Sequence, residues 1–389
     1  MKLVYDPYKK PYILSIIEEC LEQVVEESPP VYREYSEMML NMIKKPNRKG
    51  LWPETYFIMS NRVGGKTYTI GKTLLKMAMQ HDIKIGLYCR KMKKMGKYAR
   101  GVFKQVMIDC YPLWEMKEVK VSDIYTEIWM IRRSDDEDLD ESEKRHIGFV
   151  LPLNSDSDLK DSSSELAQIE VMFMDEFQSS DSVADETDKF INIHDTVARG
   201  TSRDGNNYGV RYLPTIMCSN SLSITNKYLA LFRLMDKIQP NTKLYRGNGV
   251  SLLRFKNENV AGNQMLTAFH QSLAGQKILE SNIDNAWLND NNACVGKPDG
   301  WGQGYYMCTI IDGADKYGVT KYPEMDYYYI GRVIDKTDTC IYNISPGGVE
   351  NVPLLRKTII FDNLRKAYSA GLCRFSDQAV KSIMEKLWL

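Results

Sequence analysis

An eight-residue segment, residues 60–67, constrains the fold of this chain most strongly, because its spacing is that of a phosphate-binding loop. It follows the apolar run 56–59 and opens a segment with helical character that reaches about residue 80. In such loops the backbone amides and the helix N-terminus cradle phosphates, while the lysine reaches the β- and γ-phosphates and the threonine binds Mg²⁺. Ser60 replaces the usual first glycine, so an ordinary strand–turn–helix is the alternative interpretation. The segment predicts a site for ATP and Mg²⁺, with nucleotide-binding residues Ser60, Arg62, Gly64, Gly65, Lys66 and Thr67.

A second buried strand, residues 169–174, ends in two adjacent carboxylates. Asp175 is expected to hold the Mg²⁺ shell together with Thr67, most simply through water. Glu176 is expected to polarise the attacking water as the general base. The alternative is a strand end that simply emerges into solvent. A phosphate loop upstream favours the catalytic interpretation, and a glutamate after the aspartate is typical of hydrolysing enzymes of this class.

Another apolar strand, residues 215–218, is followed by Ser219 and Asn220. In a parallel sheet its tip is expected beside the tip of the carboxylate strand. Asn220 is then placed to hydrogen-bond the attacking water or Glu176, and so to sense the γ-phosphate. The alternative is a plain β-turn at these polar residues.

The segment 195–203, between those two strands, is rich in turn formers and contains Arg199. A planar guanidinium on such a loop suits an arginine finger, which neutralises charge that builds on the γ-phosphate. A surface arginine in a loose ion pair is the equally weighted alternative.

Positive charge gathers just after the second strand of the ATPase pattern, residues 84–89. The chain has 51 basic and 51 acidic residues, so a contact with DNA requires a local cluster. Within fifteen residues there is no acid, and a loop in this position can meet DNA phosphates in a sequence-independent way. A solvated helix face is the alternative. The basic residues are Arg90, Lys91, Lys93, Lys94, Lys97, Arg100 and Lys104, of which the first five are the predicted DNA contacts.

Strands alternating with helices from residue 55 onward predict an α/β domain, with a mostly parallel sheet covered on both faces. After about residue 245, Gly-rich turns separate strand-like runs, and two helices close the chain, which suggests a smaller α+β domain. The expected organisation is a helical, peripheral extension over residues 1–50, an ATPase domain over 51–240 and a C-terminal domain over 241–389. The acidic run 135–143 is expected to be a solvated loop.

The eight cysteines are dispersed, so neither a zinc site nor a disulfide framework is expected. No apolar run is long enough to span a membrane, and the N-terminus has no signal-peptide pattern. A soluble, intracellular protein is therefore expected.

From about residue 55 to 389 the chain resembles the DNA-packaging ATPases of small short-tailed phages, which are relatives of the large terminase subunits. The order of the motifs makes the resemblance specific, although the N-terminal 50 residues are an addition. The segments that carry it are the phosphate loop with Arg62 in its third position, Tyr88–Lys93, Phe173–Phe177, Asp195–Arg199, Met217–Ser221, and 364–367 through 374–378.

This resemblance implies a homopentameric ring that works on double-stranded DNA at the capsid portal (connector) protein, in the host-cell cytoplasm and away from membranes. It implies that Lys93 faces DNA and that Arg199 acts in trans on a neighbouring subunit. Lys160 is the candidate for a second trans-acting cation. Ser219 and Asn220 lie in the segment that resembles the coupling strand.

The resemblance also implies an RNase-H-like C-terminal domain. Asp312 and Asp335 end strand-like runs there, but no convincing set of acids for two metals is evident, so a vestigial nuclease is expected. Three alternatives remain: an active terminase nuclease, a helicase or other nucleic-acid-dependent ATPase, and a scaffold protein with an inactive phosphate loop.

Overall fold

The chain divides into two compact units, residues 1–222 with 240–288, and residues 223–239 with 289–389. The computed structural model describes residues 6–61, 65–90, 95–121, 124–133, 143–178, 183, 185–199, 211–221, 226–235, 237–238, 242–272, 294–296, 302–345 and 348–388. Most of the acidic run at 135–143 lies outside these residues.

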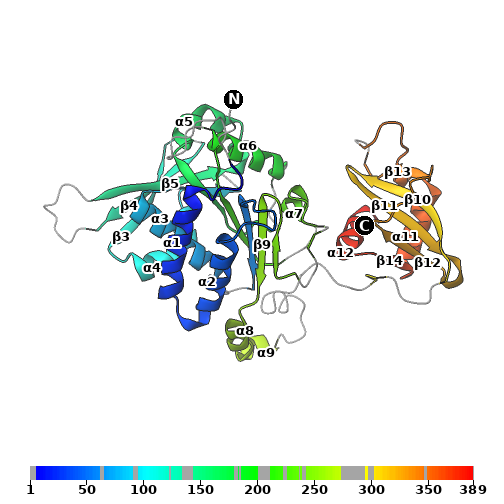
Figure 1. Cartoon of the computed structure of the whole chain (residues 1–389), viewed down its shortest axis with the longest axis horizontal. Helices are drawn as coiled ribbons and strands as arrows, with labels where there is room; N and C mark the ends of the chain where they lie inside the picture. Colours follow the sequence, from blue (N-terminus) through cyan, green and yellow to red (C-terminus); the bar gives the residue numbers. More distant parts are fainter. Residues whose placement is uncertain are drawn as a thin grey trace. The chain divides into compact units, whose positions relative to one another are not determined.

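The first unit is built on a large, mostly parallel sheet (Figure 1). Within the described residues its strand order is β3-β4-β5-β2-β6-β7-β1-β9-β8. The parallel strands are β1 (Thr55–Ser60), β2 (Lys84–Cys89), β5 (Lys144–Pro152), β6 (Ile169–Met174), β7 (Thr215–Ser219) and β9 (Val250–Phe255). Antiparallel partners complete the two edges: β3 (Trp114–Lys120), β4 (Thr126–Arg132) and β8 (Leu244–Arg246). The predicted α/β fold is confirmed.

Helices cover both faces of this sheet because neighbouring residues of each strand point to opposite sides. Ile58 of β1 and Leu87 of β2 belong to the core shared with α1 (Tyr12–Glu27), α2 (Pro30–Ile43), α3 (Lys66–His81) and α4 (Tyr98–Cys110). On the other face, the Tyr88 ring lies 5.0 Å from that of Phe190 in α6 (Glu186–Ala198). Short helices α5 (Ser163–Leu166), α8 (Glu258–Met265) and α9 (Ala268–Ser272) complete the unit.

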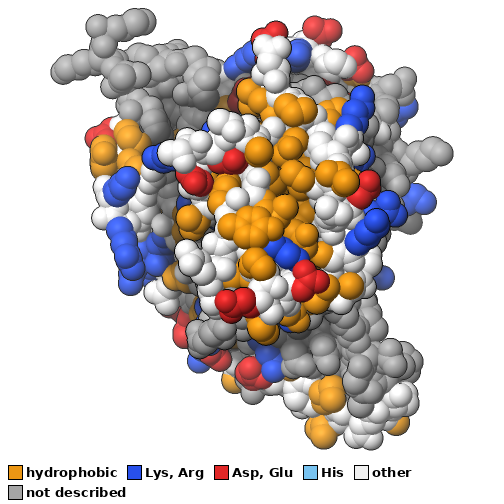
Figure 2. All heavy atoms as spheres, turned by 90° about the vertical axis from the view of Figure 1, so that its right-hand side faces the viewer, with side chains coloured by type: hydrophobic (Ala, Val, Ile, Leu, Met, Phe, Trp, Pro, Cys, Tyr) orange, Lys and Arg blue, Asp and Glu red, His pale blue; other side chains and the backbone are white. Residues whose placement is uncertain are grey.

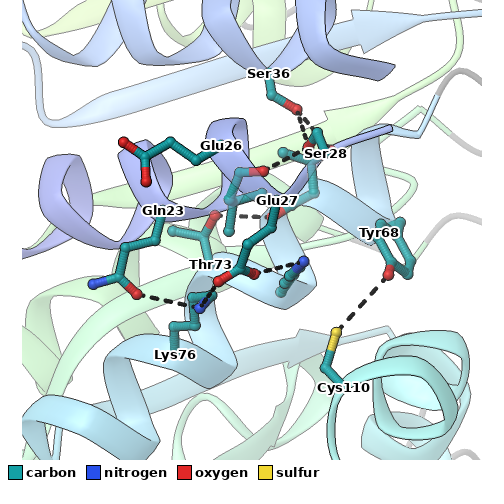
Figure 3. A network of polar contacts seen from close by, with 12 residues as sticks. Gln23, Glu26, Glu27, Ser28, Ser36, Tyr68, Thr73, Lys76 and Cys110 are labelled. Atoms are coloured by element: carbon teal, nitrogen blue, oxygen red, sulfur yellow. Dashed lines mark hydrogen bonds and ion pairs between the residues drawn. The ribbon is translucent and has the colours of Figure 1, made fainter. Parts of the chain in front are cut away.

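The N-terminal segment is helical but not peripheral, which corrects the sequence-based expectation. Leu14, Cys20 and Leu21 of α1 are fully buried and belong to the main core of the first unit. The helix also makes polar contacts with α3: Gln23 and Glu27 accept from the Lys76 ammonium at 3.2 and 2.8 Å (Figure 3). The apolar stripe of α1 is therefore the surface that covers α3, rather than a face for an external partner.

The boundary expected near residue 240 also differs in the structure. Strands β8 and β9 belong to the sheet of the first unit, since β9 pairs in parallel with β1 from Thr55↔Val250 to Ser60↔Phe255 and β8 pairs with β9. Without β9, β1 would be an edge strand of the sheet, with one side open to solvent. Conversely, residues 223–239, including α7 (Lys227–Leu231), belong to the second unit.

The second unit contains a mixed sheet with the order β13-β10-β11-β12-β14 within the described residues. Its core also takes in residues of α11 and α12, including Leu364 and Met384. The face of this unit visible in Figure 2 carries gathered hydrophobic side chains with Lys and Arg among them. The bounds are β10 (Tyr305–Asp312), β11 (Asp315–Tyr322), β12 (Tyr327–Gly331), β13 (Ile341–Asn343), β14 (Cys373–Phe375), α11 (Ile359–Ser369) and α12 (Gln378–Trp388). Within the described part of the chain, no helix is long and apolar enough to cross a membrane.

Candidate functional site

The phosphate loop is held firmly at both of its described ends. Ser60 is the last residue of β1 and is fully buried, with its hydroxyl donating to the Asn61 carbonyl at 3.1 Å. The Asn61 side chain accepts from the Asn257 backbone N–H at 3.0 Å and donates to its carbonyl at 3.4 Å. Gly65 precedes α3 with a φ of 89°, a conformation that favours glycine. The predicted nucleotide-binding residues Arg62 and Gly64 lie outside the described residues.

The two predicted magnesium ligands lie side by side. The Thr67 hydroxyl donates to the two carboxylate oxygens of Asp175 at 3.2 and 3.3 Å. Mg²⁺ prefers oxygen ligands, and a hydroxyl beside a carboxylate fits that preference. Burial raises the pKa of the Asp175 carboxyl, and the nearby Lys66 charge lowers it in part. These residues therefore fit a bound Mg²⁺, whose charge would favour the ionised form of the carboxylate.

Glu176 is exposed and adopts a left-handed backbone with a φ of 54°. Such a φ is uncommon for a residue with a side chain, and here it reverses the chain at the tip of β6. The next residue returns to the neighbouring strand, where the Phe177 N–H donates to the Cys218 carbonyl at 3.0 Å. The turn thereby leaves the Glu176 carboxylate in solvent next to the magnesium ligands.

Asn220 contacts the phosphate-loop lysine instead of Glu176. The Lys66 ammonium donates to the Asn220 side-chain oxygen at 2.6 Å. The neighbouring Ser219 is buried, and its hydroxyl accepts from the Gln178 N–H at 3.3 Å and donates to the Asn220 carbonyl at 2.8 Å. Strand β7 lies between β6 and β1, so its tip links the carboxylate turn to the phosphate loop. The sequence predicted adjacent strand tips but not this lysine contact.

Arg199 lies at the amino ends of the parallel strands, whereas the phosphate loop follows the carboxyl end of β1. It follows the last residue of α6, which runs back from the carboxyl end of β6 toward the start of β7. Arg211 holds this helix end, because its N–H donates to the Ala198 carbonyl at 2.9 Å and its guanidinium to that of Ile169. Ile169 begins β6, and six residues of strand, about 20 Å, separate it from the carboxylate end. Arg199 is exposed, and it lies at the opposite end of the strands from Asp175.

Lys160 is exposed on a short 3₁₀ helix (Asp158–Ser162). The segment before it packs on α6, where the Asn192 side chain donates to the Asp156 carboxylate at 2.8 Å. Lys160 therefore lies in a segment that packs beside α6, the helix that ends at Arg199.

Arg90 is largely buried in an ion pair, which weighs against its predicted role as a DNA contact. Its Nε donates to Glu186 at 3.0 Å and its terminal nitrogen to the Phe177 carbonyl at 2.8 Å. The Arg90 side chain is 11% exposed and that of Glu186 is fully buried. The reason is that a buried carboxylate requires a charged partner, and Arg90 is the cation at the adjacent tip of β2.

The remaining basic residues divide into two groups. Lys97, Arg100 and Lys104 are exposed at and along the start of α4, spaced so that they share one face. Lys91, Lys93 and Lys94 lie outside the described residues, so their contact with DNA stays a prediction.

Replacing Arg90 with alanine is expected to destabilise the first unit by about 3–5 kcal/mol, because it removes the guanidinium that pairs with the buried Glu186 carboxylate. Urea unfolding followed by tryptophan fluorescence measures this change. Lys97→Ala is the matched control and should change stability by less than about 0.5 kcal/mol. Equal stability of the two variants, with weaker DNA binding by Arg90→Ala alone, would restore Arg90 as a DNA contact.

The second unit shows no assembled nuclease centre among its described residues. Asp312 pairs with Asp315 across the β10–β11 hairpin, and burial with the Asp315 charge raises the pKa of the Asp312 carboxyl. Asp335 instead accepts from the N–H and hydroxyl of Thr337 at 2.9 and 2.7 Å. No group of three or more His, Cys, Asp or Glu side chains in the described residues could hold a metal ion. The nuclease-like origin of this unit stays a prediction.

A sequence model of the podovirus DNA encapsidation protein (Gp16) family matches residues 139–389, which is more than half of the chain. The chain belongs to this family. The match includes the carboxylate turn, Arg199, Asn220 and the whole second unit. The phosphate loop of this encapsidation protein lies upstream of the matched region, so its assignment depends on the loop's own spacing and geometry.

Solved structures extend the similarity to the upstream part of this encapsidation protein. A chain of the bacteriophage phi-29 genome packaging motor assembly aligns over 86% of this chain and 94% of its own, with 16% identity and a TM-score of 0.56. At this identity the two chains share a fold. The Phi-28 gp11 DNA packaging motor aligns over 86% and 93% with 12% identity and a TM-score of 0.47. The large terminase ATPase domain of Thermus phage P74-26 aligns over 60% and 89%, with 9% identity and a TM-score of 0.37. Curated protein sequences give no match.

Four residues that pack around the candidate site were missed by reasoning from sequence. Asn257 fastens Asn61, and Arg211 fastens the end of α6 that bears Arg199. Arg254 donates to the Ser221 hydroxyl at 3.2 Å beside the tip of β7, and burial lowers its pKa to about 10. Tyr32 of α2 lies against Gly65. Each acts across a long sequence separation, and no local motif marks it.

Proposed function

We propose that this chain is the ATP-hydrolysing subunit of a motor that moves double-stranded viral DNA into a preformed capsid. The observation that carries the proposal is the meeting of Lys66, Thr67, Asp175, Glu176 and Asn220 at the carboxyl edge of one parallel sheet. Membership of the DNA encapsidation family supports viral DNA as the substrate that is moved. The fold shared with a phi-29 packaging-motor chain over 86% of this chain supports a motor subunit of that architecture.

In the proposed reaction, Lys66 neutralises the β- and γ-phosphates, and Thr67 with Asp175 holds Mg²⁺. The metal supplies charge neutralisation at the phosphates when it is bound. Glu176, exposed at the β6 turn, takes the proton from the attacking water. The position of its carboxylate outside the hydrogen-bond network of Asp175 and Thr67 leaves it accessible for this role.

We propose that Asn220 couples the site to the rest of the motor. Its bond to the Lys66 ammonium joins the tip of β7 to the group that meets the γ-phosphate. Binding and loss of that phosphate would therefore alter the force on β7. The turn at Glu176 would respond as well, because the Phe177 and Gln178 amides bond to the last residues of the same strand.

We propose that subunits assemble as a ring, with five members implied by the resemblance, and that Arg199 and Lys160 enter the neighbouring subunit's site. The support is geometric, since Arg199 lies at the edge opposite to its own phosphate loop while remaining exposed. Exposed Lys97 and the upstream lysines are the proposed DNA contacts. The capsid portal protein is the proposed docking partner, and the infected host cell is the proposed place of work.

The deciding experiment is steady-state ATP turnover by the full chain with and without double-stranded DNA. A motor is expected to hydrolyse ATP faster when duplex DNA is present, and turnover that ignores DNA would contradict translocation. Asn220→Ala is expected to lose the stimulation, and unchanged stimulation in that variant would contradict the coupling role. Metal-dependent nicking of plasmid DNA that is lost in Asp312→Ala would favour the active terminase alternative.

A further inference from the structure

A cavity of about 420 Å³ opens beside the first turn of α3 and extends from Lys66 and Thr67 to residues that have no role in the reaction proposed above. This volume is within the usual range for a small-molecule site. One wall is the backbone of residues 65–68, at the phosphate loop itself. The opposite walls come from different helices: Pro29 and Tyr32 at the start of α2, and Gln105 and Asp109 on α4.

Tyr32 touches the loop that holds the phosphates. A Cβ placed on Gly65 would lie only 2.9 Å from the Tyr32 ring, so the ring is packed directly against this glycine. Gly65 is the residue from which α3 starts, and the helical hydrogen bonds begin with the Thr69 N–H, which donates to the Gly65 carbonyl at 2.8 Å. The amides of residues 66–68 are therefore the donors that a phosphate chain meets.

The position of Tyr32 is set by several contacts of α2 and of the preceding turn. Pro30 starts α2, and the Val31 carbonyl accepts from the Asn257 side chain at 2.8 Å. Ser36, one turn after Tyr32, lies 3.4 Å from Thr69 of α3, measured between their hydroxyl oxygens. The aromatic wall is thus attached both to α3 and to the segment that fastens the phosphate loop.

A network of polar contacts fixes the same turn from the α1 side (Figure 3). Glu27 pairs with the ammonium groups of Lys72 and Lys76 at 2.8 Å each. These contacts and the Lys72 and Lys76 charges lower the pKa of Glu27 against the opposing effect of its burial. Ser28 follows directly and donates to the Val24 carbonyl at 2.6 Å. The turn from α1 to Pro29 is thereby pinned onto α3.

We propose that this cavity holds the nucleoside of the bound ATP, with Tyr32 as the aromatic wall on which the base stacks. A triphosphate on the amides of residues 66–68 continues naturally into a space that begins at those same residues. Gln105 and Asp109, whose side chains hydrogen-bond at 2.9 Å, present an amide and a carboxylate to the ribose hydroxyls from the far wall. The N-terminal helices then belong to the ATP site. This proposal rests on the proposed ATPase function.

The test compares two ligands on the full-length protein by calorimetric titration: Mg-ATP, and inorganic tripolyphosphate with Mg²⁺, which has no nucleoside. Tyr32→Ala is expected to weaken ATP binding about tenfold, as for loss of one base–aromatic stack, with tripolyphosphate affinity unchanged. Tyr32→Phe keeps the ring and should bind ATP as the wild type does. Tyr12→Ala removes an exposed tyrosine of α1 and is the matched control.

Three outcomes would overturn the proposal. Equal weakening of both ligands by Tyr32→Ala would mean that the ring only braces the phosphate loop. Unchanged ATP affinity in that variant would place the base elsewhere. In both cases the wild type still binds ATP, so the ATPase function survives. A wild type that binds neither ligand would instead remove the proposed function together with this inference.

Discussion

Arg199→Ala is expected to lower ATP turnover by about 10³-fold or more while each subunit still binds ATP, because an arginine finger stabilises the transition state rather than the bound substrate. The helix end that carries Arg199 is fastened to the start of β6 by Arg211, so we expect the guanidinium to serve the site of a neighbouring subunit. Steady-state turnover together with equilibrium ATP binding measures the effect. Arg133→Ala, which removes another exposed arginine of the first unit, should leave turnover unchanged.

Mixing inactive subunits separates a finger supplied in trans from one that acts within its own subunit. Arg199→Ala subunits keep an intact phosphate loop, and Lys66→Ala subunits keep an intact finger. Where the two meet in a ring, one complete site forms, so a mixture is expected to recover part of the turnover that neither variant has alone. If every mixture stays inactive, Arg199 does not act across an interface in the way proposed here.

Glu176→Gln is expected to lower the rate of hydrolysis by about 10³-fold, since an amide cannot accept the proton of the attacking water. Substitution by glutamine preserves size, and Glu176 lies exposed, so folding and Mg-ATP binding should persist. Single-turnover hydrolysis measures the chemical step, and ATP titration measures binding. Glu115→Gln, on the exposed part of β3, is the matched control.

Two results would contradict the role of Glu176. Turnover that survives in Glu176→Gln would place the general base elsewhere. Loss of ATP binding in parallel with turnover would indicate that the carboxylate supports the turn at β6. Glutamine must adopt the same left-handed backbone as Glu176. A loss of ATP binding in Glu176→Gln would therefore come from the lost carboxylate charge and not from a changed backbone preference.

Much of the first unit was predictable because its signals are local. Apolar runs of strand length alternate with helical periodicity, and each predicted strand of the central sheet forms close to its expected residues. Asp175 and Thr67 meet because both follow the carboxyl ends of parallel strands, as that topology requires. The same topology brings Asn220 to Lys66, although reasoning from the strand order alone suggested the attacking water or Glu176 as the partner.

The errors share one physical cause, which is that burial depends on residues distant in sequence. In the sequence, Arg90 is one of a run of basic residues. In the structure it forms a buried ion pair with Glu186, which lies 96 positions later. The sequence of β9 was assigned to the second domain, but in the structure β9 pairs with β1 and belongs to the first unit. The N-terminal helices read as an addition, yet their apolar stripe covers α3 and brings Tyr32 to Gly65.

By itself, the sequence determined the alternation of strands and helices and predicted a phosphate loop and a metal-and-base carboxylate pair, because each depends on neighbouring residues and on backbone geometry. Only the tertiary structure decided which cation faces solvent, which sheet edge bears Arg199 and which helices wall the cavity at the phosphate loop. Those outcomes depend on pairing and desolvation between distant segments, whose free energies are set only when the whole unit has packed.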